Sequence, residues 1–264
     1  MTKICPLFSS SRGNSIYVGS EKSGILVDVG RSAKQIEKGL VENGISVKSI
    51  KAIFITHEHS DHIQGVRIFA SRYNIKVYSS KGTIQALDEK GILDGGFSFE
   101  VIDEAGAEIS NMYIKPFKTP HDSSESVGYM ISTQEGKKAV IATDIGYMSD
   151  DIKKAIVGAH AVVIESNHDV RMLQNGGYPY YLKRRILSNI GHLSNEACAD
   201  VLPFFVETGS TKFILAHLSQ ENNIPELAYE TAICNLKSHK MVNNVDFQLH
   251  IAPAENYGSL CLTI

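Results

Sequence analysis

A cluster of metal-ligand side chains in one short segment limits most strongly what this chain folds into. The segment Thr56–His62 reads T-H-E-H-S-D-H. It follows an apolar, β-branched strand pattern at Ala52–Thr56 and precedes a helical pattern at Ile63–Tyr73. Three imidazoles and one carboxylate so close together are the ligand types of a transition-metal site. The sequence therefore predicts a metal-binding turn at the end of a buried strand.

Side chains in so short a turn alternate in direction, so one metal ion cannot easily take all of them. His57 and His59 suit one ion, and Asp61 and His62 suit another. A solvated, His-rich turn is the plain alternative. The motif H-x-H-x-D-H arises by chance about 6 × 10⁻⁴ times in a chain of this composition. The alternative also leaves the strand–turn–helix setting unexplained, so the metal interpretation is favoured.

Three further ligand types lie just after other predicted strands. His121 follows a strand pattern at 113–117, Asp144 follows 138–143, and His217 follows 212–216. Each residue alone is more often a turn or capping residue. Together, at the carboxyl ends of strands, they complete two sets of ligands and leave a position open for water, as hydrolytic metal sites do.

The remaining pattern indicates a layered α/β protein. Strand and helix patterns alternate, with a hairpin-like pair at Val127–Ser132 and Lys138–Thr143. No Pro-, Gly- or Ser-rich linker divides the chain, so we expect one domain over residues 1–264. The 26 Lys and Arg residues against 29 Asp and Glu give a net charge of −3, which excludes nucleic-acid binding by bulk positive charge.

Membrane and secreted classes are not indicated. The longest apolar runs fall far short of the ~20 residues that a bilayer requires, and the N-terminal segment has no signal-peptide pattern. The four cysteines are scattered, without a C-x-x-C pair. We therefore expect a cytoplasmic protein with buried, reduced thiols and no disulfide frame.

The order of these motifs resembles the metallo-β-lactamase superfamily, and the resemblance covers nearly the whole chain. Several short sequence segments are similar to those of the bacterial YycJ/WalJ/VicX group of metal-dependent hydrolases. The order of the later motifs is similar to that of tRNase Z. The segments that carry the resemblance are Ser10–Ser15, Thr56–His62, Glu165–His168, Gly191–Asn195 and His217–Asn223.

The resemblance implies a four-layer αββα sandwich, with two β-sheets flanked by helices, and two divalent metal ions, Zn²⁺, Mn²⁺ or Fe. One ion would be held by His57, His59 and His121, the other by Asp61, His62 and His217, with Asp144 bridging them. Asp28, after an upstream apolar strand, would orient the His-rich turn by hydrogen bonds. From the residues alone, a turn cap before Gly30 is the preferred interpretation of Asp28.

Two segments are candidates for contact with a substrate. His192, just before a helix that Ser194 is placed to cap, is either a general acid or a capping histidine. Its position matches a histidine of tRNase Z, which favours the acid. The run Lys183, Arg184 and Arg185 follows several tyrosines and suits a nucleic-acid strand, but an exposed helix start is commoner for so short a run. Ser9–Ser15 suits a phosphate loop weakly and an ordinary β-turn better.

The function that these residues favour is a dinuclear metal phosphodiesterase acting on nucleic acid. The resemblance implies a 5′-to-3′ exonuclease, with DNA favoured over RNA. Asp61 would orient the attacking water and His192 would protonate the leaving oxygen. Typical zinc β-lactamases of the superfamily differ at His62 and Asp144. A thioester or lactone hydrolase on the same metal site remains an alternative, as does a non-catalytic regulator that keeps the metal turn.

Overall fold

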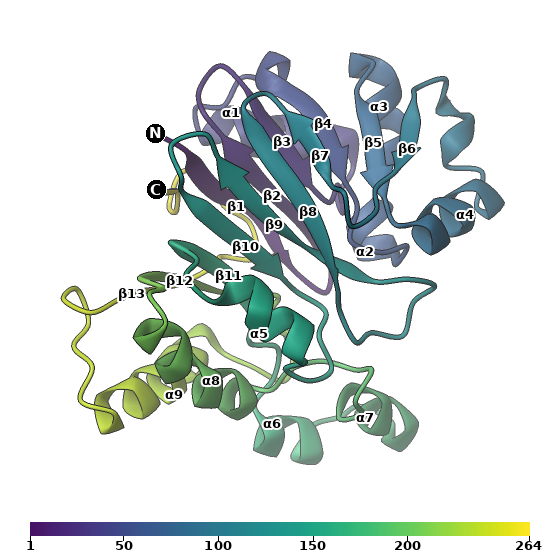
Figure 1. The fold of residues 1–264 in the computed structure, drawn as a ribbon. Coiled ribbons are helices and arrows are strands. Elements are labelled where there is room, and N and C mark those ends of the chain that lie inside the picture. The colour runs from purple at the N-terminus through teal and green to yellow at the C-terminus, as the bar shows by residue number, and fades with distance from the viewer.

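The computed structural model describes residues 1–264 and consists of two seven-stranded sheets packed face to face (Figure 1). The first sheet has the order β14-β1-β2-β3-β4-β5-β6 and the second β13-β12-β11-β10-β9-β8-β7. The strands of the first sheet, in chain order, are β1 (Lys3–Ser10), β2 (Gly13–Gly19), β3 (Gly24–Val27), β4 (Ile50–Phe54), β5 (Lys76–Ser79), β6 (Phe99–Val101) and β14 (Leu262–Thr263). Those of the second are β7 (Ala107–Ile109), β8 (Met112–Lys118), β9 (Val127–Thr133), β10 (Lys138–Ala142), β11 (Ala161–Glu165), β12 (Lys212–Ala216) and β13 (Gln248–Ile251).

Helices cover the outer face of each sheet (Figure 1). The helices in the first half of the chain are α1 (Ala33–Glu42), α2 (Ser60–Ile63), α3 (Val66–Tyr73) and α4 (Lys81–Glu89), with short 3₁₀ turns at Val47–Ser49 and Leu93–Gly95. Those in the second half are α5 (Asp150–Ile156), α6 (Val170–Asn175), α7 (Tyr180–Ile186), α8 (Asn195–Glu207) and α9 (Pro225–Ser238). No helix is long and apolar enough to span a bilayer.

Three apolar layers hold the sandwich together, and period-two alternation in the strands separates them. In β4, Ala52 and Phe54 face the layer between the sheets, whereas Ile53 packs under α1 and α3. A third layer lies between the second sheet and helices α5, α8 and α9. The predicted αββα sandwich is confirmed. The single-domain organisation stays a prediction, which the layer shared by both sheets supports.

The strand directions bring several strand ends to one edge. Strands β10 to β13 pair in parallel, so their carboxyl ends lie together, and the predicted β9–β10 hairpin is antiparallel, as expected. The end of β4 reaches the same edge, because the Val127 amide at the start of β9 donates to the Thr56 carbonyl at 3.1 Å. The loops that carry the predicted ligands therefore converge.

The helical pattern predicted at Ile63–Tyr73 is divided into α2 and α3 around Gly65. A Cβ atom on Gly65 would lie 2.1 Å from the Arg31 carbonyl oxygen, so only glycine allows this approach. The break lets α2 turn toward the strand ends while α3 packs on the first sheet. The helix at Glu196–Val206 and its Ser194 cap are found as predicted, since Ser194 Oγ accepts from the Ala197 amide at 3.2 Å.

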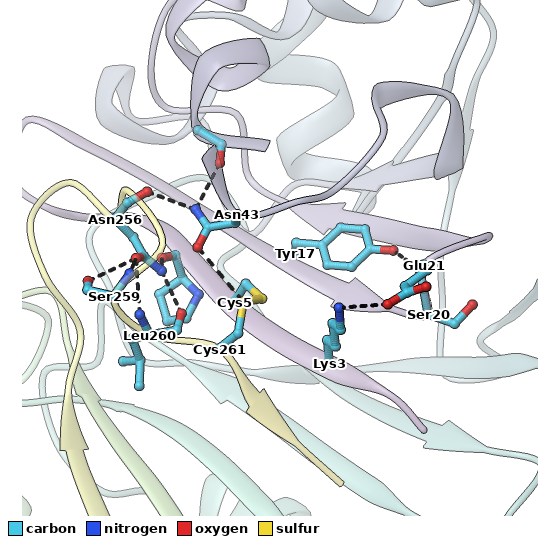
Figure 2. Close-up of a disulfide and its surroundings, with 12 residues drawn as sticks. Lys3, Cys5, Tyr17, Ser20, Glu21, Asn43, Asn256, Ser259, Leu260 and Cys261 are labelled. Atoms are coloured by element: carbon cyan, nitrogen blue, oxygen red, sulfur yellow. Dashed lines mark hydrogen bonds and ion pairs between the residues drawn. A yellow bond between two sulfur atoms is a disulfide. The ribbon is translucent and has the colours of Figure 1, made fainter. Parts of the chain in front are cut away.

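The prediction of four reduced thiols is wrong for one pair. Cys5 on β1 and Cys261 beside β14 form a disulfide with a Cα–Cα distance of 4.4 Å (Figure 2). The antiparallel register pairs Lys3 with Thr263 and Ile4 with Leu262, so the next position places the two cysteines opposite each other. The short C-terminal strand was not predicted, and its pairing with β1 could not be inferred from the spacing. The other two cysteines are free; Cys198 is buried, as expected, and Cys234 is exposed.

Candidate metal centre

The first predicted ligand set converges on one point. The turn after β4 presents His57 and His59, and the loop after β8 brings His121 against them. His57 Nε2 lies 3.0 Å from His59 Nδ1, and His121 Nε2 lies 3.2 Å from the same atom. All three atoms fall within 4.8 Å of one another, close enough for one metal ion to bind all three.

The second predicted set forms beside the first. Asp61 and His62 lie at the start of α2, and His217 follows β12 directly. Asp61 Oδ2 lies 3.4 Å from His62 Nε2 and 3.8 Å from His217 Nε2. This group also fits within 4.8 Å.

Asp144 lies between the two groups. Its Oδ2 is 3.2 Å from His62 Nε2 and 2.9 Å from His217 Nδ1, while its Oδ1 is 3.8 Å from His121 Nε2. One carboxylate thus faces both sets, which is the arrangement expected of a bridging ligand. Five imidazoles and two carboxylates fit borderline divalent ions such as Zn²⁺ or Mn²⁺. The structure brings all seven residues together, and their binding of metal stays a prediction.

Asp28 contacts the His-rich turn, as the resemblance implied, and its role in orienting metal ligands stays a prediction. Its Oδ1 accepts from the Thr56 amide at 2.8 Å, and its Oδ2 lies 2.8 Å from His62 Nδ1. Because Nδ1 of His62 is engaged, Nε2 is the nitrogen left for a metal ion. A similar contact fixes His121, whose Nδ1 donates to the Gly191 carbonyl oxygen at 3.0 Å. Such contacts set the tautomer and the ring orientation of ligating histidines.

The buried charges of the centre compensate one another. Burial alone would raise the pKa of Asp144, but the positive charges of His217 and His62 hold that pKa well below its usual range. Burial would lower the pKa of His62, yet Asp144, Asp28 and Asp61 raise it well above its usual value. A divalent ion would displace the imidazole proton and take its place as the counter-charge.

His192 lies at the rim of this centre and is oriented by a residue that had no predicted role. Its Nδ1 lies 2.8 Å from Oε1 of Glu165, the last residue of β11. Glu165 is fully buried, and its Oε2 accepts from the Ile145 and Leu193 amides at 2.7 and 3.2 Å. Because Nδ1 faces the carboxylate, Nε2 is the free nitrogen.

His192 is also close to the ligand cluster. Its Nδ1 lies 3.7 Å from Asp144 Oδ1, and its ring centre lies 5.1 Å from that of His121. Glu165, His192, Asp144 and His217 satisfy the same 4.8 Å spacing as the two predicted sets. The assignment of His192 as an acid rather than a ligand therefore stays a prediction.

The basic run lies on α7, and its three members have different partners. Arg185 forms a bidentate salt bridge with Asp122, in which Nη2 donates to Oδ1 at 2.8 Å. Asp122 Oδ1 in turn lies 3.5 Å from Nε2 of the predicted ligand His121. Arg185 is thus placed beside the metal centre.

The other two cations do not reach the centre. Lys183 Nζ donates to the Gln174 carbonyl at 2.8 Å, and the Arg184 guanidinium lies 6.0 Å from the ring centre of Tyr180. Tyr180 and Tyr181 are 77% and 75% exposed. The structure therefore divides the run into one residue beside the metal ligands and a cationic, aromatic surface further out.

A family model described as the beta-lactamase superfamily domain matches residues 24–250. The chain belongs to the metallo-β-lactamase superfamily. Among its relatives, the exodeoxyribonuclease YycJ of Bacillus anthracis is 42% identical over 230 residues, covering 84% of each chain. The exodeoxyribonuclease WalJ of Streptococcus pneumoniae is 38% identical over 251 residues, covering 94% of this chain and 93% of the relative.

Solved structures share the fold over the whole length of this superfamily member. The metallo-β-lactamase fold protein YhfI of Bacillus subtilis aligns with a TM-score of 0.73 at 15% identity, covering 99% of this chain and 98% of that one. The short form of human tRNase Z aligns with a TM-score of 0.66 at 17% identity, covering 99% of both chains. At these identities the likeness shows the fold alone.

Two residues at this superfamily site were missed as functional candidates. Glu165 lies in a segment that carried the resemblance, and a carboxylate ending an apolar strand was the available signal. Asn14 lies in the Ser9–Ser15 segment, which is the β1–β2 turn as preferred from the sequence. The turn packs against Asp61 and His62, and no local pattern could have shown that contact.

Proposed function

We propose that this protein is a metal-dependent exonuclease that hydrolyses phosphodiester bonds of nucleic acid, with DNA as the favoured substrate and the 5′ end as the point of attack. The observation that carries the proposal is the position of Asp144 between two complete ligand sets. The names of the relatives YycJ and WalJ support DNA as the substrate. The fold and the His/Asp clusters support the use of divalent metal, and the proposal adds two ions per chain, Zn²⁺, Mn²⁺ or Fe.

The metal-binding roles follow the geometry. His57, His59 and His121 would hold one ion, Asp61, His62 and His217 the other, and Asp144 both. When bound, two such ions supply Lewis acidity toward water and toward the phosphate oxygens. Asp61 is 20% exposed at its side chain and can orient the attacking water from the rim of the cluster.

His192 is the proposed general acid. Glu165 holds Nδ1, which fixes the ring and leaves Nε2 to deliver a proton to the departing alkoxide. The side chain of His192 is 14% exposed, so its proton can be replaced from solvent after each turnover. The buried Glu165 carboxylate therefore fixes the orientation of the ring from the side away from Nε2.

Lys183, Arg184 and Arg185 are the proposed substrate contacts. Arg185, which is paired with Asp122 beside His121, would contact the phosphate nearest the metal ligands, and Lys183 and Arg184 would contact the strand further out. The net charge of −3 limits the proposal to a small contact area near the metal centre. A cytoplasmic location also belongs to the proposal; it is supported by the nuclease names of the relatives and not by the cysteines, two of which form a disulfide.

The test is digestion of end-labelled single- and double-stranded DNA and RNA in Mn²⁺ or Zn²⁺, with Asp144→Ala as the inactive control. Loss of nucleotides from the 5′ end of DNA, absent in the control, is the expected result. Turnover of S-lactoylglutathione without cleavage of DNA or of bis(p-nitrophenyl) phosphate would instead favour the thioesterase. Full metal content with no turnover of any ester would favour a regulator.

A further inference from the structure

Asn14 lies at the predicted second metal set, although the sequence suggested only a weak phosphate-loop role for its segment, Ser9–Ser15. The residue is in β2, just after the β1–β2 turn, and is 4% exposed. Its Nδ2 lies 3.0 Å from the Ser10 carbonyl oxygen, 3.2 Å from Asp61 Oδ2 and 3.1 Å from His62 Nε2. The side chain thus contacts two of the three residues in that set.

Close packing of three backbone segments holds Asn14 there. The Gly30 amide donates to the Asn14 carbonyl at 2.8 Å, so the segment after β3 runs beside the turn. A Cβ atom on Gly30 would lie 1.7 Å from the Asp61 carbonyl oxygen and 2.5 Å from the Asn14 nitrogen. Only glycine at position 30 lets the turn approach Asp61 this closely.

The hydrogen-bond capacity of the amide decides what it does. A carboxamide nitrogen carries two protons. Four atoms lie within 3.4 Å of it, namely the Ser10 and Asp61 carbonyl oxygens, Asp61 Oδ2 and His62 Nε2, and the Asp61 carboxylate is the charged acceptor among them. The other groups close to the Asp61 carboxylate are His62 and His217, both of which would turn their nitrogens to a bound ion. Asn14 is then the one neutral donor that holds Asp61 whether or not metal is present.

We propose that Asn14 is a positioning residue that pre-forms the Asp61–His62–His217 set and so determines the affinity of the second metal ion. The inference rests on the proposed dinuclear site. Loss of contacts that orient metal ligands lowers metal affinity about 10- to 100-fold. The His57–His59–His121 set has no contact with Asn14, so its affinity should not change.

The test is calorimetric titration of metal-free protein with Zn²⁺ or Mn²⁺, together with Co²⁺ absorption spectra, in the absence of nucleic acid. The native protein should bind two ions. Asn14→Ala should keep the tight site and bind the second ion about 10- to 100-fold more weakly. Asn14→Ser, whose side chain is too short to reach Asp61, should behave alike and provides a second variant if the alanine protein folds poorly.

The matched control is Asn256→Ala. Asn256 is fully buried and donates to the Pro6 and Leu260 carbonyls, away from the metal centre, so its loss should lower stability and leave both affinities unchanged. Unchanged second-ion affinity in both Asn14 variants, or equal weakening of both ions, would overturn the assignment. A native protein that binds two ions but cleaves no DNA would refute the nuclease and leave the role of Asn14 standing.

Discussion

Reduction of the Cys5–Cys261 disulfide should destabilise the protein, because the bridge closes almost the whole chain into one loop. The two residues are 256 positions apart. For a loop of 256 residues, the chain-entropy relation gives about 5.5 kcal/mol at 25 °C from the restricted unfolded state. The bridge also joins the C-terminal segment to β1. Within that segment, the Asn256 side-chain amide donates to the Leu260 carbonyl at 2.6 Å (Figure 2).

The measured loss in the free energy of unfolding should be smaller than this chain-entropy value. Strand β14 has only two residues and lies at the edge of its sheet, so the reduced chain can still fold around the remaining strands. Removal of a disulfide typically costs about 2–4 kcal/mol. For a chain of this size, that loss corresponds to a fall in Tm of roughly 5–15 °C.

The assay is thermal unfolding of the native protein with and without dithiothreitol, and of Cys261→Ser. Cys234→Ser is the matched control, because Cys234 is exposed and free. Titration of thiols in denaturant without reductant should find two of the four cysteines reactive. Four reactive thiols, or equal Tm values for the two variants, would refute the reasoning.

Three further predictions concern the metal centre and its surroundings. Asp144→Ala should abolish activity and lose most of one metal ion; full metal content by elemental analysis would contradict the bridging role. Neutralising Lys183, Arg184 and Arg185 together should weaken DNA binding and flatten its salt dependence, with little loss on a small diester. An unchanged salt slope would mean that the run is only a solvated surface. His192→Ala should lower DNA turnover about 10²- to 10⁴-fold with metal content intact. The same variant should affect a nitrophenyl diester far less, because nitrophenolate leaves without a proton; equal losses on both substrates would exclude the acid role.

Much of the fold and of the candidate metal centre could be predicted because both depend on local patterns. Predicted strands followed within a few residues by ligand-type side chains mark His121, Asp144 and His217, and a layered α/β fold brings strand ends to a common edge. The dense motif at Thr56–His62 then indicates which edge that is. The bounds of the helices were harder to predict, because the break between α2 and α3 at Gly65 depends on a contact with a distant backbone segment.

Contacts between distant segments could not be predicted. Glu165 is recognisable as the partner of His192 only once β11 is seen beside the loop that carries His192. Asn14 contacts Asp61, which is 47 residues away in sequence. Cys5 lies opposite Cys261 because β1 pairs with β14, and no turn motif in the sequence predicts that pairing. In each case the residue type was ordinary for its local position, and tertiary packing alone gave it a partner.

Buried residues with a strained backbone occur only at the candidate metal centre. Asp28, Asp144 and His217 have left-handed φ angles of 63°, 57° and 55°, and each is at most 2% exposed. The other non-glycine residues with positive φ, at positions 74, 110, 111, 240 and 244, are all exposed. A left-handed L-residue costs about 1–2 kcal/mol, and such strain persists where surrounding structure enforces it. Asp28 and His217 come directly after a strand and Asp144 follows one closely, so the sharp turn directs each side chain into the cluster. Buried strain confined to these residues indicates that the strand ends are shaped to direct the predicted ligands Asp144 and His217, and the supporting Asp28, into the cluster.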